Sequence, residues 1–594
     1  MSWFIAILPK REFQSRSEID SLRKNLIDLA PTKPELILAN EKMVLIGGGK
    51  QDTFKYKISD DVSSKSGWIV CGIGIFYDGD TPSTMRYDHW DAVLGDRAAL
   101  SNVNRINGHY TIIKWDEQGY YLFCDELELR RLYISEVQDK FIISTRLDWI
   151  IPFLRNPVLK IEKLASEWML VNSLSDECFI DGVTRLGASG RMSIINGKIT
   201  HTWQPWTPTA SPNSCIIPIL ANTTNLPLRE RKKLTLGLSG GVDSRTLLAL
   251  LSRSPGDVWQ IHSCGNKGNQ DVHIAAILAE TLHLRSDISY FERRQDETIE
   301  TMIQSLKEIA LHEEISDPIF GYPRFQVFSK LSRQGFWMID GGYGELLRRS
   351  YGNRLFLAGK RAIKEKNAAA MLPYLSHPKA AIFSDKILHG FRTQAEMHLQ
   401  NAVDRMPEIE NGDVGTWLDI FHIRYRLKNF PANGQAAYDQ VIASYMPYAQ
   451  SVLLSAYCSL ASKQRRNNKF NRKIIREGDP ALRKVPLVGS GQSMPYWTIN
   501  HVLLSRVVSK FKRRFLTNSV DRGKTFRAES LMFLREYILD RLTSRPVKTC
   551  AYYNYPEIRR TVEDFYKGKI ENDVFIEEWL AFDFWRELLD QPRP

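Results

Sequence analysis

The stretch Leu238-Ser-Gly-Gly-Val-Asp-Ser-Arg245 decides how the fold of this chain is interpreted. It follows a short apolar run, residues 234–238, that is typical of a buried strand, and it precedes residues 246–251, whose apolar pattern indicates a helix. A turn that joins a strand to a helix presents backbone N–H groups at the positive end of the helix dipole, which together form an anion site. Gly240 and Gly241 would let the backbone approach a phosphate closely.

The side chains of this loop predict that the anion is a phosphate chain with a metal ion beside it. The hydroxyls of Ser239 and Ser244 add donors, whereas the carboxylate of Asp243 would repel a phosphate unless Mg²⁺ lay between them. No lysine follows the glycines, so the loop suits pyrophosphate as a leaving group rather than the lysine-containing type of phosphate loop. The alternative is a glycine-rich turn that binds nothing, which the full string of loop residues makes the weaker interpretation. The candidate residues for binding ATP and pyrophosphate here are Leu238, Ser239, Gly240, Gly241, Asp243 and Ser244.

The segments around this loop predict an α/β domain. Residues 258–263 indicate a second strand and residues 273–284 a second helix. Strands that alternate with helices favour a parallel sheet with right-handed crossovers. From about residue 350 the pattern becomes mostly amphipathic helix, so we expect a large helical extension.

The chain before this domain is predicted to be rich in β-structure. Short runs of β-branched and aromatic residues alternate with turn residues, and Asn196-Gly197 is a strong signal for a tight hairpin turn. Residues 204–213 are rich in Pro, Ser and Thr, with few groups that could anchor a core, and we interpret them as a linker. We therefore expect two domains, residues 1–205 and 206–594.

Composition limits the class of protein. The seven cysteines are scattered and form no C-x-x-C pair, which argues against a disulfide framework or a structural zinc site. No apolar run is long enough to span a bilayer, and charges come too early at the N-terminus for a secretory signal, so a cytoplasmic location is expected. The net charge of +12 would attract an anionic partner, but no nucleic-acid-binding motif accompanies the basic residues, and we do not expect nucleic acid.

The loop resembles the pyrophosphate loop of the N-type ATP pyrophosphatases, and the resemblance extends to the asparagine synthetases. In the first half, Arg105-Ile-Asn-Gly-His-Tyr-Thr-Ile-Ile-Lys-Trp-Asp116 resembles a strand pair of that family, and Asp125-Glu-Leu-Glu-Leu-Arg-Arg-Leu-Tyr133 resembles the segment that follows it. The resemblance implies an N-terminal glutaminase-like domain of the Ntn-hydrolase type, followed by a doubly wound parallel-sheet ATP pyrophosphatase domain. It also implies ATP and Mg²⁺ as cofactors.

One departure from the family changes the expected reaction. The family's glutaminase uses a cysteine at the mature N-terminus, whereas this chain has Ser2 there and its first cysteine is Cys71. A thiolate is a far better nucleophile near neutral pH than an unactivated hydroxyl. We therefore expect a degenerate glutaminase-like domain that serves as a scaffold and supplies no ammonia.

Relatives with such a degenerate first domain, the lasso-peptide cyclases and the β-lactam synthetases, join an amine already present in the substrate. By that resemblance we expect adenylation of an Asp or Glu side chain in a lasso precursor peptide, followed by attack of its N-terminal amine to form an isopeptide bond. A leader peptidase and a leader-binding protein are further candidate partners. Two alternatives stay open: an ammonia-dependent amidotransferase of the asparagine synthetase type, and a non-catalytic ATP-binding scaffold.

A second acidic segment, Trp337-Met-Ile-Asp-Gly-Gly-Tyr-Gly-Glu-Leu-Leu-Arg-Arg349, resembles the family loop whose aspartate helps to hold magnesium. In the simplest alignment Gly344 takes the place of that aspartate. Asp340 and Glu345 flank it, so the predicted metal ligands are Asp243, Asp340 and Glu345, and the alternative is a turn with two solvated acids. Gly342 is assigned to ATP binding. Tyr343 is the candidate for the tyrosine that acts with a glutamate as a base in β-lactam synthetases.

Four further residues complete the expected site. Lys484 is the candidate for the family lysine that neutralises negative charge during adenylation, although a solvated loop lysine is an equal alternative. His262 and Ser263 end the second predicted strand, where nucleotides bind in open parallel sheets, and a core histidine is the alternative for His262. Asp271 is predicted to cap the second helix.

Overall fold

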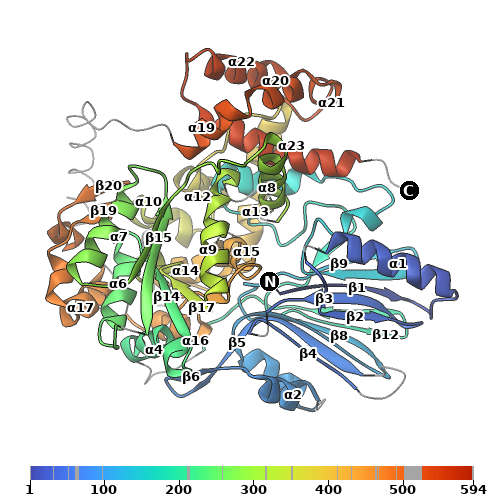
Figure 1. The fold of residues 1–594 in the computed structure, drawn as a ribbon, viewed down its shortest axis with the longest axis horizontal. Helices are drawn as coiled ribbons and strands as arrows, with labels where there is room; N and C mark the ends of the chain where they lie inside the picture. Colours follow the sequence, from blue (N-terminus) through green and yellow to red (C-terminus); the bar gives the residue numbers. More distant parts are fainter. Residues whose placement is uncertain are drawn as a thin grey trace.

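The computed structural model shows a mixed α/β protein whose sheets differ in type along the chain (Figure 1). Antiparallel strands come first, a parallel sheet follows, and helices dominate the remainder. In the described ranges no helix is both long and apolar enough to pass through a lipid bilayer. The structure describes residues 2–30, 32–50, 52–59, 66–95, 98–209, 215–256, 258–312, 314, 318–348, 352–410, 413–429, 431–461, 464–465, 467–489, 491–500 and 525–591.

The first part of the chain forms two antiparallel sheets, coloured blue to cyan in Figure 1. One sheet has the order β11-β9-β10-β1-β3-β2, and the other has the order β13-β12-β8-β7-β5-β4 with β6 beside β5. The strands are β1 (Trp3–Pro9), β2 (Leu36–Ala39), β3 (Val44–Gly48), β4 (Phe54–Ile58), β5 (Gly67–Asp78), β6 (Thr81–Thr84), β7 (Asn107–Asp116), β8 (Gly119–Cys124), β9 (Tyr133–Val137), β10 (Lys140–Ser144), β11 (Val183–Arg185), β12 (Arg191–Ile195) and β13 (Lys198–Thr202).

Alternation of side chains along these strands builds four layers. Phe4 and Ala6 of β1 pack against Ile69 of β5 in the core between the two sheets. The intervening residues of β1, such as Ile5, face away from that core and pack in the cluster that includes Leu26 of helix α1 (Arg16–Leu29). On the outer face of the other sheet, the side chains of β5 pack with those of helix α2 (Tyr87–Gly95). The order of layers is helix, sheet, sheet, helix.

The predicted hairpin at Asn196-Gly197 is confirmed. Strands β12 and β13 pair antiparallel with Ile195 opposite Lys198. Asn196 has a φ of 51° and Gly197 a φ of 72°. Two successive positive φ values are what a type I′ turn requires, and Asn-Gly adopts them at low cost.

The parallel sheet has the order β16-β15-β14-β17-β18, and each neighbouring pair runs parallel. The ring of His262 lies 5.6 Å from that of Phe328 in α9, whereas a Cβ on Gly265 would touch Val272 of α7. Because positions 262 and 265 point to opposite faces of a strand, helices cover both faces of the sheet. The elements are β14 (Lys233–Gly237), α6 (Val242–Leu251), β15 (Trp259–Gly265), α7 (Gln270–Thr281), β16 (Ser286–Tyr290), α8 (Ile299–His312), α9 (Pro323–Arg333), β17 (Phe336–Asp340), the 3₁₀ turn η5 (Gly344–Arg348) and β18 (Ser444–Tyr445).

Helices make up most of the described chain after β17. The last of them form a layer at the top of Figure 1, where α23 crosses beneath α20 and α22. A short hairpin, β19 (Leu487–Gly489) and β20 (Gln492–Met494), interrupts the helical part. The helices are α10 (Asn353–Ala358), α11 (Lys360–Lys364), α12 (Ala368–Leu375), α13 (Asp385–Asp404), α14 (Val414–Phe421), the π-helix η7 (His422–Leu427), α15 (Pro431–Tyr438), α16 (Ser451–Cys458), α17 (Lys469–Glu477), α19 (Phe526–Phe533), α20 (Arg535–Thr543), α21 (Arg545–Lys548), α22 (Tyr555–Tyr566) and α23 (Asp573–Asp590).

The segment interpreted as a linker is anchored in its described part. Trp206 is 2% exposed, its indole N–H donates to the hydroxyl of Ser451 at 2.8 Å, and its carbonyl accepts from Nε of Arg424 at 2.7 Å. The segment is therefore anchored at Trp206, while the described residues on either side of it are exposed or half-buried. Residues 210–214 lie outside the described residues.

Buried charges join the antiparallel part to the helical part. Oδ2 of Asp439 lies 2.7 Å from Nη1 of Arg130 and 2.8 Å from Nε2 of His109, and all three side chains are at most 4% exposed. Arg131 pairs with Glu314 at 2.7 Å. Ion pairs with this burial require close and complete partnering, so they fix how the two parts meet.

Candidate functional site

The 239–244 loop lies between β14 and α6, in the middle of the parallel sheet, as the sequence predicts. The hydroxyl of Ser244 accepts from the N–H of Ser239 at 3.1 Å and lies 3.0 Å from the Ser239 hydroxyl. The Ser239 hydroxyl in turn accepts from the N–H of Gly241 at 3.2 Å. The two serines therefore hold the loop in shape, and the last residues of the loop form the first turn of the ten-residue helix α6.

Close packing explains Gly240. A Cβ at this position would lie 2.2 Å from Cγ2 of Val488 in β19, and the Gly240 carbonyl accepts from the N–H of Val488 at 2.8 Å. The N–H of Gly240 donates to Oδ1 of Asp271 at 3.0 Å. One face of the loop is thus covered by the β19–β20 hairpin, a contact that the sequence did not reveal.

The prediction that Asp271 caps α7 was wrong. The cap is Asn269, whose side chain accepts from the N–H of Asp271 at 2.8 Å. Both residue types cap helices well, and they lie two positions apart, so the sequence pattern does not separate them. The carboxylate of Asp271 holds the 239–244 loop instead, and burial raises its pKa.

Asp243 lies in the first turn of α6, directly against the loop that follows β17. A Cβ on Gly344 would lie 2.5 Å from Cβ of Asp243, and a Cβ on Gly341 would lie 2.7 Å from the backbone nitrogen of Ser244. The two loops therefore meet without space for a side chain. Gly344, which takes the place of the family aspartate, has no room for a carboxylate because Asp243 fills that space.

The other two predicted metal ligands have partners of their own. Oδ1 of Asp340 accepts from the N–H of Gly342 at 2.7 Å, and burial raises the pKa of this carboxyl. Glu345 forms an ion pair with Arg426 of η7 at 3.2 Å. Within the ranges that the structure describes, no group of three His, Cys, Asp or Glu side chains lies close enough together to hold a metal ion.

This arrangement still fits Mg²⁺ that arrives with ATP. Magnesium is usually held by one or two carboxylates together with phosphate oxygens and water, so it does not need a three-carboxylate cluster. Asp243, beside the predicted phosphate site, meets that requirement. Asp340 is a better candidate than Glu345 for a second ligand, because Glu345 forms an ion pair with Arg426. The assignment of metal ligands stays a prediction.

The environment of Tyr343 disfavours the predicted role as a base. Its side chain is 2% exposed, and its hydroxyl has no hydrogen-bond partner in the described part of the chain. Burial raises its pKa well above the ordinary value for tyrosine. Its φ of 65° is unusual for a residue other than glycine, which indicates local strain in this loop.

Lys484 lies on a segment that Arg245 holds against α6. The Arg245 guanidinium donates to the carbonyls of Leu482, Val485 and Pro486 at 3.1, 2.7 and 2.5 Å. The side chain of Lys484 is exposed, and its own backbone N–H donates to Ala481. Arg245 is a residue that sequence reasoning missed, although an arginine just before the apolar run of α6, residues 247–251, is a signal that it is buried and paired.

The residues at the end of β15 face in different directions. His262 is buried under α9, its Nδ1 lies 2.9 Å from the hydroxyl of Thr235, and burial lowers its pKa to about 4. It is therefore neutral near neutral pH, and its burial favours a structural role. Ser263 points to the opposite face, toward α7, and Leu238 extends the ladder by donating its N–H to the carbonyl of His262 at 2.9 Å.

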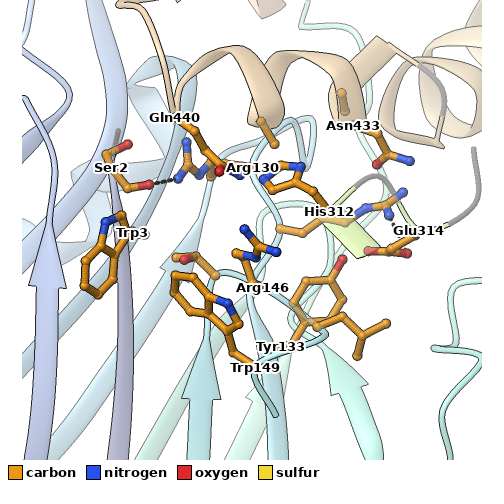
Figure 2. Close-up of a pocket in the computed structure, with 15 residues that line it drawn as sticks. Ser2, Trp3, Arg130, Tyr133, Arg146, Trp149, His312, Glu314, Asn433 and Gln440 are labelled. Carbon is orange, nitrogen blue, oxygen red and sulfur yellow. Dashed lines mark hydrogen bonds and ion pairs between the residues drawn. The ribbon is translucent and has the colours of Figure 1, made fainter. Parts of the chain in front are cut away.

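Ser2, which stands where the family has its cysteine, is fully buried. Figure 2 shows it among the side chains that line a small cavity. Its carbonyl accepts from Arg130, and its hydroxyl has no partner among the described residues. The cavity beside it measures about 30 Å³, room for roughly two water molecules. Arg146 and His312 line the same cavity, and a glutamine side chain has no space there.

Comparison with known proteins agrees with this geometry. Residues 218–344 match the model of the asparagine synthase family. This segment is an asparagine synthase domain. It runs from α4 (Ile216–Thr224) to the start of η5, so it contains both the 239–244 loop and the loop after β17. That family comprises ATP-dependent amide-forming ligases.

The other comparisons do not extend the match to the asparagine synthase family. No curated protein matches the chain at a significant level. Among solved structures, the chain is similar to glutamine phosphoribosylpyrophosphate amidotransferase from B. subtilis, complexed with ADP and GMP, with 9% identity and a TM-score of 0.21 over 64% of this chain and 80% of that one. It is also similar to a structure of the allosteric regulatory enzyme of purine biosynthesis, with 9% identity and a TM-score of 0.21 over 64% and 82%. At these TM-scores the likeness carries no structural argument.

Proposed function

We propose that this chain uses ATP to adenylate a side-chain carboxylate of a lasso precursor peptide and then joins it to the peptide's own N-terminal amine. A carboxylate oxygen attacks the α-phosphorus of ATP, and pyrophosphate leaves. The amine nitrogen then attacks the acyl carbon, AMP leaves, and the nitrogen gives up a proton as the isopeptide bond forms. The observation that carries this proposal is the 239–244 loop at the start of α6, in the middle of the parallel sheet of an asparagine synthase domain.

Several of the predicted residues have a place in this reaction. The start of α6 and the serine-held loop would bind the leaving pyrophosphate, as helix N-termini bind anions. Asp243 and Asp340 would hold Mg²⁺, which neutralises charge on the phosphates when bound. Lys484 would bring a cation to the charge that develops at the α-phosphate.

An amine within the substrate is favoured over ammonia released from glutamine, because the described residues around Ser2 leave no space for glutamine. The cavity of about 30 Å³ at Ser2 is far too small for that substrate, and the nucleophile there is a hydroxyl. We propose that residues 1–205 are a degenerate Ntn-hydrolase-like glutaminase domain acting as a scaffold, and that residues 206–594 are the adenylating domain. A leader peptidase and a leader-binding protein would prepare the precursor.

The test is incubation of the purified protein with ATP, Mg²⁺ and candidate precursor peptides, with mass spectrometry of the peptide and separate detection of AMP and pyrophosphate. The proposal expects AMP, pyrophosphate and a peptide lighter by one water. Aspartate with ammonium in place of the peptide is the comparison arm. AMP formation that depends on ammonium and not on the peptide would favour the amidotransferase and contradict the cyclase, and ATP binding with no pyrophosphate release in any arm would favour the scaffold.

A further inference from the structure

A cleft of about 940 Å³ opens between the antiparallel sandwich and the segment that leads into β14. One wall is formed by the start of β4 and by residues 84–88, and the other by residues 229–232 at the end of α5 (Leu226–Arg229). Trp337 lines it as well, at the start of β17. The cleft thus lies at the amino ends of β14 and β17, whereas the 239–244 loop lies at the carboxyl end of β14.

The carboxylates that line this cleft are already engaged. Asp52 accepts from Nζ of Lys232 at 2.8 Å and from the indole N–H of Trp337 at 3.0 Å. Glu230 accepts from both the N–H and the hydroxyl of Thr84, at 2.7 and 2.6 Å. The remaining two are likewise bonded, Asp88 to Arg86 at 3.2 Å and Glu35 to the N–H of Gly49 at 3.3 Å.

Three cationic side chains of the cleft form no ion pair with these carboxylates. Nζ of Lys55 donates to the backbone carbonyl of Asp52 at 2.7 Å and has no ion pair with any described carboxylate. Arg229 donates to the carbonyl of Pro82 at 2.7 Å, and Arg231 likewise has no carboxylate partner in the described part of the chain. Burial lowers the pKa of Lys55 to about 8, and the nearby charges of Asp52 and Glu230 offset this desolvation only in part.

The aromatic side chains of the cleft lie on two faces of the sheet. Tyr87, against Trp68, is on the face that carries Lys55, whereas Phe54 and Tyr56 alternate with Lys55 along β4 and point to the other face. Tyr56 is 36% exposed and Tyr87 is 47% exposed, and both line the cleft. Tyrosine is enriched at binding surfaces because it combines a large apolar area with a polar end.

We propose that this cleft docks an acidic segment of a separate protein chain. Lys55, Arg229 and Arg231 bind its carboxylates, and Tyr87, on the same face of the sheet as Lys55, contacts an apolar side chain of the segment. A peptide suits the lining better than a nucleotide does, because its carboxylates can be spaced to reach Lys55, Arg229 and Arg231 and avoid the four carboxylates of the walls, whereas the charges of a polyphosphate are contiguous. The position at the amino ends of β14 and β17 leaves the 239–244 loop open while the cleft is occupied, so the partner is bound in addition to ATP.

The experiment uses the full chain and a fluorescein-labelled oligo-glutamate peptide that contains one leucine, with binding followed by fluorescence anisotropy. Binding should saturate, weaken as salt is raised, and be absent for the matching oligo-glutamine peptide. Lys55→Gln should weaken it about tenfold or more, Lys55→Arg should restore most of the affinity, and the double change Arg229→Gln with Arg231→Gln should weaken it similarly. Lys198→Gln, an exposed lysine on β13, is the matched control and should change nothing.

Thermal melting of each variant separates a lost contact from a lost fold, and the two arginines are exposed, so their double variant should melt like the parent chain. Absence of saturable binding to the folded parent chain would overturn the proposal. So would equal losses in Lys55→Gln and Lys198→Gln. Displacement of the labelled peptide by ATP or AMP would show instead that the cleft is a nucleotide site or that the peptide binds at the 239–244 loop.

Discussion

Gly344 and Asp243 show how one missing side chain sets the chemistry of this site. A Cβ on Gly344 would lie 2.5 Å from Cβ of Asp243, so the loop after β17 can approach α6 only with glycine there. Asp243 then occupies the contact between the two loops. We therefore expect the metal function to depend on Asp243 more than on any other carboxylate.

Replacing Asp243 with Asn should lower pyrophosphate release by about a hundredfold or more, because a neutral amide cannot balance the charge of Mg²⁺ beside the phosphates. The fold should persist, since the amide has the same shape. Pyrophosphate release and a melting curve check the two halves of this prediction. Asp404→Asn, at an exposed position at the end of α13, is the control, and full turnover in Asp243→Asn would refute the metal role.

Tyr343→Phe tests whether the tyrosine takes part in proton transfer. The change removes a buried hydroxyl that lacks a described partner, so stability should stay constant or rise by up to about 1 kcal/mol. Because the pKa of this phenol is raised by burial, AMP formation should also be retained. A large loss of cyclisation with an unchanged melting temperature would show that Tyr343 is the base after all.

His262 predicts a dependence of stability on pH. Its pKa is about 4 in the folded chain against 6.5 unperturbed, so between these values the unfolded chain binds more protons. Stability should therefore fall as the pH drops from 6.5 to 4, by up to about 3 kcal/mol from this group. Denaturant midpoints at pH 7 and pH 4.5 measure the loss, and His262→Gln should make it smaller. An unchanged slope in that variant would assign the loss elsewhere, for example to His398, whose pKa is also lowered to about 4.

At the scale of elements, the β19–β20 hairpin completes the loop that follows β14. Val488 contacts Gly240, and Arg245 binds the carbonyls just before the hairpin. Local patterns predicted the strand, loop and helix around residue 240 because their signals lie within a few residues. The hairpin contacts join positions more than two hundred residues apart, and no local pattern reveals them.

Gly240→Ala should displace this hairpin. The added methyl would lie 2.2 Å from Cγ2 of Val488 and 3.1 Å from Cβ of Ile274, so we expect a loss of about 1–3 kcal/mol in stability together with slower AMP formation. Adding Val488→Ala should recover part of both. Gly390→Ala in α13 is the control of opposite sign. Nothing lies within 4 Å of a Cβ added at this position, so the free energy of unfolding should rise by up to about 1 kcal/mol. Chemical denaturation measures all three.

At the scale of the whole molecule, buried ion pairs bind the antiparallel part to the rest. The carboxylate of Asp439 contacts the side chains of both Arg130 and His109. Nothing in the sequence around these three residues indicates that they are partners. The sequence separated a β-rich part from an α/β part by composition, yet it could not place their junction, because that depends on pairs of charges that become buried only after both parts fold.

Asp439→Ala should destabilise the chain by about 3–5 kcal/mol, since it leaves Arg130 buried without a counter-charge. The loss should appear as earlier denaturation and faster proteolysis at the junction. Glu365→Ala removes the exposed partner of Arg361, whose side chain is 89% exposed, and should cost less than about 1 kcal/mol. Equal effects of the two variants would contradict the structural role of the junction.

The filled space around Ser2 has a practical consequence for chemical probes. Electrophilic mimics of glutamine inactivate glutaminases by entering their pocket and capturing the terminal sulfur. Here neither the sulfur nor the space exists, since only about 30 Å³ lies beside a buried hydroxyl. Such reagents should leave Ser2 unlabelled, and peptide mapping after treatment should place any label on an accessible thiol such as Cys215.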